Sequence, residues 1–183
     1  MTQTERDMLP DDIDRVLLTE EQIQHRIREL GAELSDHYRE RKPLLVGVLT
    51  GAYVFMADLS RAMDIELDVE FMAVSSYGMA TETSGVVRIL KDLDTAIEGK
   101  DVLIVEDIID SGLTLQYLLD VLNRRNPNEI RVVALLKKIR YDAVPVRVDY
   151  LGFEIPDEFV VGCGLDAGRR FRNLPYVAVV RTD

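Results

Sequence analysis

The stretch Val102-Leu-Ile-Val-Glu-Asp-Ile-Ile-Asp-Ser-Gly-Leu-Thr114 decides the fold of this chain. It opens with four apolar residues, the pattern of a strand that is buried on both faces of a parallel sheet. Two adjacent carboxylates follow, Glu106 and Asp107, and a glycine-containing turn then leads into apolar residues at helical spacing over 115–122. A strand that passes through a polar turn into a helix is typical of α/β proteins with a mostly parallel sheet.

The turn at residues 110–114 is a candidate anion site. Ligands of open α/β sheets bind beyond the carboxyl ends of the strands, and the start of a helix offers unpaired N–H groups to a phosphate. Gly112 allows close approach of the backbone, while the hydroxyls of Ser111 and Thr114 add donors. Carboxylates beside an anion site make sense if they bind sugar hydroxyls or if Mg²⁺ lies between them and the anion. The sequence therefore predicts a phosphorylated sugar as the ligand.

A structural role for the same acids is the alternative. Asp107 and Asp110 would then cap the following helix, and Glu106 would be a solvated strand end. Two other phosphate-binding classes are disfavoured, because the chain has neither a G-x-x-x-x-G-K-[ST] run nor a G-x-G-x-x-G run.

Outward from this stretch, the apolar pattern alternates between strand and helix. Thr19 and Gln22 form a capping-box pattern before apolar residues at helical spacing, which predicts a helix from Glu20 to Tyr38. Further elements follow the same reasoning: strands at 44–49, 67–75 and 130–136, and a helix at 53–63. The small polar residues between Ser76 and Val86 predict a mobile loop.

The whole chain is expected to form a single domain, 1–183, because no repeat, linker or low-complexity tract interrupts it. The core is expected over about 40–145. Short apolar segments separated by Pro and Gly from residue 146 predict a small hood, formed by about 146–183 together with the N-terminal segment.

Composition restricts partners and location. With 22 basic and 33 acidic residues the formal charge is −11, the wrong sign for binding nucleic acid. No apolar run reaches the ~18 residues that a membrane helix needs, and residues 1–14 carry no targeting pattern, so we expect a cytoplasmic protein without membrane partners. The single Cys163 is expected to serve packing. His25 and His37 lie off the apolar stripe of the first helix and are expected on its solvated face.

Residues 102–114 resemble the signature of the type I phosphoribosyltransferases, an apolar strand, two acids, an apolar pair and Asp-Ser/Thr-Gly-x-Thr, without a break over the thirteen positions. Residues 148–166 and 171–176 resemble the members of that family that act on hypoxanthine and guanine. The resemblance implies the fold of the family. It also implies Mg²⁺-dependent transfer of the phosphoribosyl group from phosphoribosyl pyrophosphate to either purine, giving IMP or GMP and pyrophosphate.

The resemblance assigns roles to the central motif. The 5-phosphate would be held by Asp110, Ser111, Gly112, Leu113 and Thr114. Glu106 and Asp107 would contact the ribose hydroxyls, directly or as metal ligands through Mg²⁺. Asp110 would also be the general base that takes a proton from the attacking purine nitrogen, and a carboxylate serves well as a base at neutral pH if burial raises its pKa.

The resemblance also implies that three residues recognise the purine: Lys138, Phe159 and Val160. Lys138 matches the lysine that donates to the 6-oxo group, so adenine should be rejected. Phe159 would stack on the base, and the backbone carbonyl of Val160 would bind its edge. Asp166 matches a second Mg²⁺ ligand, and Arg172 a pyrophosphate contact.

Two further segments are assigned by the same resemblance. Thr50 and Gly51 occupy the position of the family's pyrophosphate loop. Many relatives have a cis peptide in this loop, which in this chain would join Leu49 and Thr50. Ser75, Ser76 and Tyr77 would start a catalytic flap, which includes residues 79–83 and excludes water on closing.

Two other functions stay open. One is a relative that prefers xanthine and guanine, and the other is an RNA-binding attenuation regulator built on the same fold, against which the negative charge counts. Relatives form dimers or tetramers, so a homodimer or homotetramer is expected.

Overall fold

The computed structural model describes residues 10, 12–77 and 86–181, and its centre is a six-stranded sheet of order β4-β3-β2-β5-β6-β7. Every neighbouring pair is parallel except β3 and β4, which are antiparallel. The α/β fold with a mostly parallel sheet is therefore confirmed. The strands are β2 (Leu44–Leu49), β3 (Asp68–Tyr77), β4 (Val86–Lys91), β5 (Asp101–Ile109), β6 (Glu129–Lys138) and β7 (Tyr150–Ile155).

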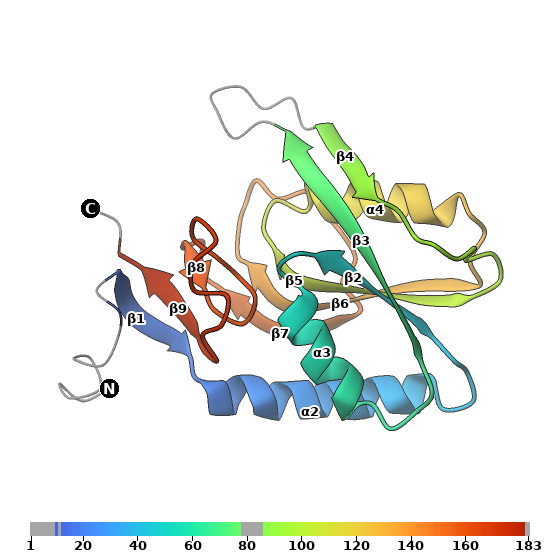
Figure 1. Ribbon diagram of the computed structural model, residues 1–183, viewed down its shortest axis with the longest axis horizontal. Helices are drawn as coiled ribbons and strands as arrows, with labels where there is room; N and C mark the ends of the chain where they lie inside the picture. The colour runs from blue at the N-terminus through green and yellow to red at the C-terminus, as the bar shows by residue number, and fades with distance from the viewer. Residues whose placement is uncertain (1–9, 11, 78–85, 182–183) are drawn as a thin grey trace.

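Helices cover both faces of this sheet (Figure 1). α2 (Glu20–His37) and α3 (Tyr53–Ala62) pack on one face, in a cluster that includes Leu103 and Val105. α4 (Leu113–Asn123) packs on the other face, in a cluster that includes Val102 and Ile104. Since successive strand residues point to opposite faces, the apolar run of β5 serves both layers, which explains why it has no polar alternation.

The helix α2 begins as its sequence predicts. The backbone N–H of Gln22 donates to Thr19 Oγ1 at 3.3 Å, and the Gln22 side chain accepts from the Thr19 N–H at 2.9 Å, which completes the capping box. His25 is exposed, as expected. The expectation for His37 is wrong, because this side chain is mostly buried and its Nε2 lies 2.9 Å from Glu129 Oε1 at the start of β6.

A second, smaller sheet joins the two ends of the chain beside the main sheet (Figure 1). Its order is β1-β9-β8, with both pairs antiparallel, and its strands are β1 (Ile13–Leu18), β8 (Val160–Val161) and β9 (Val177–Val180). This is the expected hood. The expected boundary near residue 146 is corrected, because β7 pairs in parallel with β6 and extends the main sheet to Ile155.

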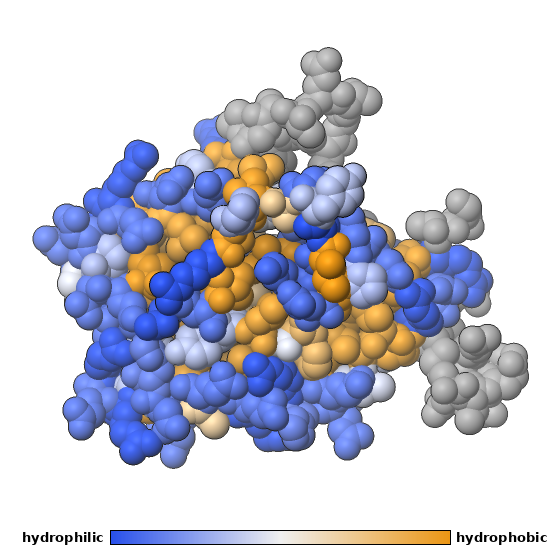
Figure 2. Space-filling model, turned by 180° about the vertical axis from the view of Figure 1, so that it is seen from behind, coloured by the Kyte–Doolittle hydropathy of each residue, from blue (hydrophilic) through white to orange (hydrophobic). Residues whose placement is uncertain are grey.

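The surface carries hydrophobic side chains in the middle of the face shown in Figure 2, surrounded by hydrophilic ones. Leu113, Ile139 and Phe159 are large, exposed hydrophobic residues; Leu113 begins α4, Ile139 directly follows β6 and Phe159 directly precedes β8. In the part of the chain that the structure describes, no helix is both long and apolar enough to cross a membrane.

Candidate active site

A cavity of about 320 Å³ opens where the carboxyl ends of β2, β5 and β6 meet the hood. Parallel strands end at the same edge of a sheet, so residues far apart in sequence gather there. Residues from the motif, the loop after β2, the end of β6 and the hood share the cavity. Its lining consists of Thr50, Gly51, Asp107, Ile108, Asp110, Lys138, Phe159, Val160, Leu165, Asp166 and Arg172.

The turn between β5 and α4 is built for close approach. Gly112 has φ +80°, and a Cβ at this position would lie 2.8 Å from the carbonyl oxygen of Val144, so only glycine fits without strain. Gly112 is also the N-cap of α4, and no side chain caps that end within the described structure. The first N–H groups of α4, from Leu113 and Thr114 onward, are therefore available to an anion, with Ser111 beside them.

The motif strand is longer than its apolar run predicts. Pairing with β6 continues to Ile109, so Glu106 and Asp107 lie within β5 and not beyond its end. Glu106 is buried and is not part of the cavity lining. Glu106 is therefore not a solvated strand end, whereas its contact with the ribose hydroxyls or Mg²⁺ stays a prediction.

Burial dominates the electrostatics of these two acids. Removal from water raises the pKa of Glu106 well above its ordinary value, and the neighbouring Asp107 charge adds to the effect. Burial likewise raises the pKa of Asp107 to about 6, against the opposing effects of the Ile108 N–H, 2.9 Å from Oδ1, and of Arg172. Asp107 also packs on Gly51, where an added Cβ would lie 1.6 Å from Asp107 Oδ2.

Asp110 has a different environment. Its side chain is 48% exposed, and its two oxygens face cations, Lys138 Nζ at 3.0 Å from Oδ2 and Arg140 Nη1 at 2.7 Å from Oδ1. The burial that would raise the pKa of a carboxylate base is thus found at Glu106 and Asp107 and not at Asp110. Asp110 is accessible from the cavity and already oriented by two ion pairs.

The purine-binding candidates come together from β6 and the hood. Lys138 ends β6, has a 10% exposed side chain, and contacts Asp157 Oδ1 at 3.2 Å as well as Asp110. Phe159 is 52% exposed, whereas Val160 is buried where β8 pairs with β9. An exposed aromatic ring next to a nearly buried ammonium group suits a flat heterocycle that carries an oxygen acceptor.

The hood also supplies an acid and a base to the cavity. Arg172 Nη2 lies 2.6 Å from Asp166 Oδ1, and its Nη1 donates to the carbonyl oxygen of Gly164 at 2.5 Å. The backbone N–H of Arg169 donates to the other oxygen of Asp166 at 2.6 Å. These contacts fix both side chains at the edge of the cavity.

The remaining candidates lie directly after β2 and on β3. The peptide between Leu49 and Thr50 is cis. Ser75 lies on β3, and its hydroxyl oxygen is buried without a hydrogen-bond partner among the described residues. Ser76 and Tyr77 are the last residues of β3, and residues 79–83 of the expected flap lie outside the described structure.

A carboxylate pair can hold Mg²⁺ here together with a substrate. Among residues 10, 12–77 and 86–181, no three His, Cys, Asp or Glu side chains gather closely enough to bind a metal by themselves. Asp107 and Asp166 nevertheless line the same cavity. Because Mg²⁺ is commonly bound through one or two carboxylates plus substrate phosphates, these two residues fit the ion.

Sequence reasoning missed two residues at this site, Arg140 and Asp157. Arg140 lies two positions after Lys138, and residues two apart on an extended segment point to the same side, which was an available signal. Asp157 stands directly before Glu158 and Phe159, in a turn whose direction the sequence pattern does not determine.

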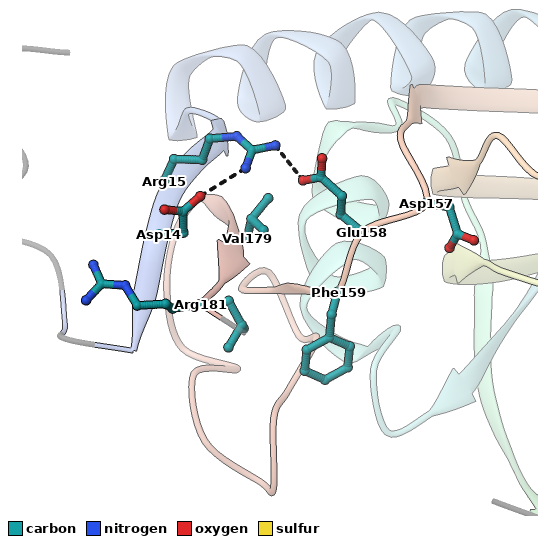
Figure 3. Close-up of a pocket in the computed structure, with 8 residues that line it drawn as sticks. Asp14, Arg15, Asp157, Glu158, Phe159, Val179 and Arg181 are labelled. Atoms are coloured by element: carbon teal, nitrogen blue, oxygen red, sulfur yellow. Dashed lines mark hydrogen bonds and ion pairs between the residues drawn. The ribbon is translucent and has the colours of Figure 1, made fainter. Parts of the chain in front are cut away.

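A second cavity, of about 500 Å³, lies on the far side of Phe159, between β1, β9 and the segment that precedes β8 (Figure 3). Arg15 crosses it, with Nη1 3.0 Å from Asp14 Oδ2 and Nη2 2.5 Å from Glu158 Oε2. Phe159 therefore borders both cavities. The ion pair of Arg15 with Glu158 ties the strand β1 to the segment that carries this ring.

The fold and this arrangement are those of a phosphoribosyl transferase domain. The family model for that domain matches residues 17–167, and the chain belongs to this family. The hypoxanthine-guanine phosphoribosyltransferase of Bacillus subtilis is 52% identical over 95% of this chain and 97% of its own length. A hypoxanthine phosphoribosyltransferase structure from Staphylococcus aureus superposes with a TM-score of 0.89 at 43% identity, covering 99% of this chain and 96% of the other.

A structure from Trypanosoma cruzi gives a TM-score of 0.88 at 39% identity and covers 94% of both chains. It was determined to study the role of the C-terminal region in the oligomeric state and enzymatic activity of a hypoxanthine phosphoribosyl transferase.

Proposed function

We propose that this protein is a purine-salvage enzyme that transfers the 5-phosphoribosyl group of phosphoribosyl pyrophosphate to hypoxanthine or guanine, releasing pyrophosphate. One observation carries the proposal: a single cavity is lined by Asp107 of the motif strand, Asp110 of the turn after it, Lys138 and Phe159. The curated relative from Bacillus subtilis, which has the named activity, aligns over almost the whole chain.

The phosphate end of the substrate would lie on the turn before α4. Asp110 through Thr114 would surround the 5-phosphate, with the N–H groups of Leu113 and Thr114 as donors. Thr50, Gly51 and Arg172 would bind the pyrophosphate on the opposite side of the ribose, since they line the same cavity. Ser75, Ser76 and Tyr77 would begin the flap that covers the reacting atoms.

Positive charge develops on the ribose ring as pyrophosphate leaves the anomeric carbon. Asp107 is the acid of the motif strand that lines the cavity, so it would stabilise this charge directly, while the buried Glu106 acts from behind it. Asp107 and Asp166 would hold Mg²⁺, which neutralises the charge of the leaving pyrophosphate when bound.

The purine would stack on Phe159, with the carbonyl of Val160 along its edge. Asp110 would accept the proton of the attacking ring nitrogen, because its exposed carboxylate faces the cavity and retains free lone pairs. Lys138 would donate to the 6-oxo group. An amino group at that position would leave the third N–H of the nearly buried Lys138 ammonium, the one not used by Asp110 and Asp157, without an acceptor, so adenine should be rejected.

The wider setting follows from the same proposal. The protein would act in the cytoplasm as one domain and would assemble as a homodimer or homotetramer, for which the study of oligomeric state in the Trypanosoma cruzi relative offers support. No observation favours RNA binding or a preference for xanthine over hypoxanthine.

The test is an Mg²⁺-dependent assay of pyrophosphate release with hypoxanthine, guanine, xanthine, adenine and uracil offered separately. Release with hypoxanthine or guanine but not with adenine or uracil is expected. Activity with uracil alone, or none with any base, would contradict the proposal.

A further inference from the structure

Four charged side chains close a ring at the edge of the cavity. Asp110 binds Lys138 at 3.0 Å and Arg140 at 2.7 Å through different oxygens. Asp157 binds the same two cations, Lys138 at 3.2 Å and Arg140 at 3.5 Å, also through different oxygens. Each acid therefore contacts both bases, and each base contacts both acids.

The members of this ring come from three separate parts of the fold. Asp110 begins the phosphate turn after β5, Lys138 ends β6 with Arg140 just beyond it, and Asp157 lies in the turn between β7 and the hood strand β8. In Figure 3 the Asp157 carboxylate points away from Arg15 and Glu158, toward the main sheet. The ring thus connects the phosphate-binding turn to the segment that carries Phe159.

Arg140 is itself held firmly. Its Nε and Nη2 donate to the two oxygens of Asp142 at 2.9 and 2.8 Å, which leaves Nη1 for Asp110. The segment that contains Arg140 is attached to the same turn a second time, because the Val144 N–H donates to the Ser111 carbonyl at 2.8 Å. A bidentate guanidinium has a defined orientation, unlike a single ammonium contact.

We propose that Arg140 and Asp157 are positioning residues: with Lys138 they fix the direction of the Asp110 carboxylate and hold the Phe159 segment at the correct distance from it. This inference rests on the proposed function, in which Asp110 and Phe159 contact the purine.

The ring leaves free the lone pairs of Asp110 and the N–H donor of Lys138 that the reaction needs. An ionised carboxylate offers about four lone-pair sites, of which the two cations use two, so Asp110 still accepts from the purine N–H. The Lys138 ammonium has three donors, of which the two acids use two, so one remains for the oxo group. Fixing both groups before the base arrives removes the reorganisation that would otherwise accompany proton transfer.

The experiment compares R140M, R140K and D157N with the wild-type enzyme, with R125M as the matched control. Arg125 forms a bidentate pair with Asp92 at 2.7 and 2.8 Å, its side chain is 31% exposed against 26% for Arg140, and it lies in the C-terminal turn after α4. R125M therefore removes a comparable ion pair away from the cavity.

Because small misplacements of a reacting group cost up to about 100-fold in rate, we expect R140M to lower kcat at least about tenfold. Its KM for phosphoribosyl pyrophosphate should stay within about twofold, since ground-state binding is not removed. R140K should restore only part of kcat, because a single ammonium keeps the charge but lacks the fork that binds Asp142 and Asp110 together. D157N should raise the KM of the base more than that of phosphoribosyl pyrophosphate, and R125M should match the wild type.

Unchanged kcat in R140M would overturn the proposal. The proposal would also be overturned if kcat fell in R140M, did not recover in R140K and fell equally in R125M. That pattern indicates a general effect on stability. Crystal structures give a readout besides activity. The Asp110 side chain should take one orientation in the wild type and several in R140M. A single unchanged orientation in R140M would contradict the role of the ring in orienting Asp110. A wild-type enzyme without transfer to any base would instead contradict the proposed function.

Discussion

Asp107 and Asp110 border one cavity but differ in burial, and this difference separates their expected effects. Asp110 is half exposed and ion-paired, so its replacement should leave the fold intact. Because general-base catalysis contributes about 10²–10⁴-fold, Asp110→Asn should lower kcat about 100-fold or more while KM changes little. Steady-state kinetics with hypoxanthine checks this, with Asp36→Asn on the exposed face of α2 as the control. An unchanged kcat would remove the assignment of Asp110 as the base.

Asp107 should make stability depend on pH. Burial raises its pKa from about 3.8 to about 6 in the folded protein, so the native state binds the proton more tightly than the unfolded state. The free energy of unfolding should therefore fall as pH rises from about 4 to about 6, by at most about 3 kcal/mol at 1.36 kcal/mol per pKa unit. Asp107→Asn removes the titrating group and should flatten this part of the profile.

Urea unfolding between pH 4 and 7.5 in the presence of a chelator measures this effect. At pH 7 the Asp107→Asn variant should be more stable than the wild type, although less active. Added Mg²⁺ should stabilise the wild type more than the variant if the ion binds the ionised carboxylate. Parallel pH profiles of the two proteins would contradict the argument.

At the level of single residues, the sequence predicted which side chains meet but not how they are buried. Residue type and the strand–turn–helix pattern were sufficient for Asp107 and Asp110, whereas Lys138 was assigned through the resemblance to the family; all three line the cavity. The burial of Glu106 depends on β5 continuing past its apolar run and on the packing around it. Ion pairs such as Arg140 with Asp110 join positions 30 apart, and no local pattern reports them.

Among the elements, the hood turns that contain Gly164 and Gly168 allow two glycine replacements to be compared directly. Gly164 has φ +99°, and a Cβ there would lie 2.0 Å from the Gly51 carbonyl oxygen, whereas Gly168 has φ +59° and open space around it. Gly164→Ala combines left-handed strain of about 1–2 kcal/mol with overpacking of about 1–3 kcal/mol. Gly168→Ala carries only the strain.

Gly164→Ala should therefore lower the free energy of unfolding clearly more than Gly168→Ala, and it should also raise the KM for phosphoribosyl pyrophosphate because it displaces the Gly51 loop. Chemical denaturation and initial-rate kinetics on both variants provide the comparison. Equal destabilisation would show that backbone strain, and not the contact with Gly51, determines the result.

The elements that the sequence predicts well are those whose apolar residues follow a clear helix or strand pattern. The helix expected at Glu20 to Tyr38 is found at Glu20–His37, and the strand expected at 44–49 has those limits. β4 and β1 were missed: β4 follows a polar loop as an edge strand, and β1 acquires its strand structure from β9. β7 was placed in the hood because its flanking prolines and glycines indicate turns, yet parallel pairing with β6 takes it into the main sheet.

For the whole molecule, we expect the two substrates to depend on different parts of the chain. Binding of the purine base should depend more on the hood, and binding of phosphoribosyl pyrophosphate more on the main sheet. β8, next to Phe159, pairs with β9, and β9 pairs with β1. Removing residues 1–18 deletes β1 and with it the contact of Arg15 with Glu158. The KM of the base should then rise by about tenfold or more, the effect of losing a single well-placed interaction worth about 1.4 kcal/mol.

Removing residues 1–9, which precede β1, is the control for that truncation. Binding of phosphoribosyl pyrophosphate should be affected less than base binding in the longer truncation, because the turn before α4 belongs to the main sheet. Calorimetric titration with each substrate separates the two effects. Equal loss of both affinities would mean that the hood and the sheet unfold together.

The pairing of β1 with β9 also has a consequence for biosynthesis. Ile13 lies opposite Val180, so the hood sheet cannot close before Val180 has left the ribosome. The strands that carry the phosphate turn are synthesised well before that point. The turn proposed for the 5-phosphate is therefore synthesised first, and the strands that complete the purine end of the cavity are among the last parts of the site to be made.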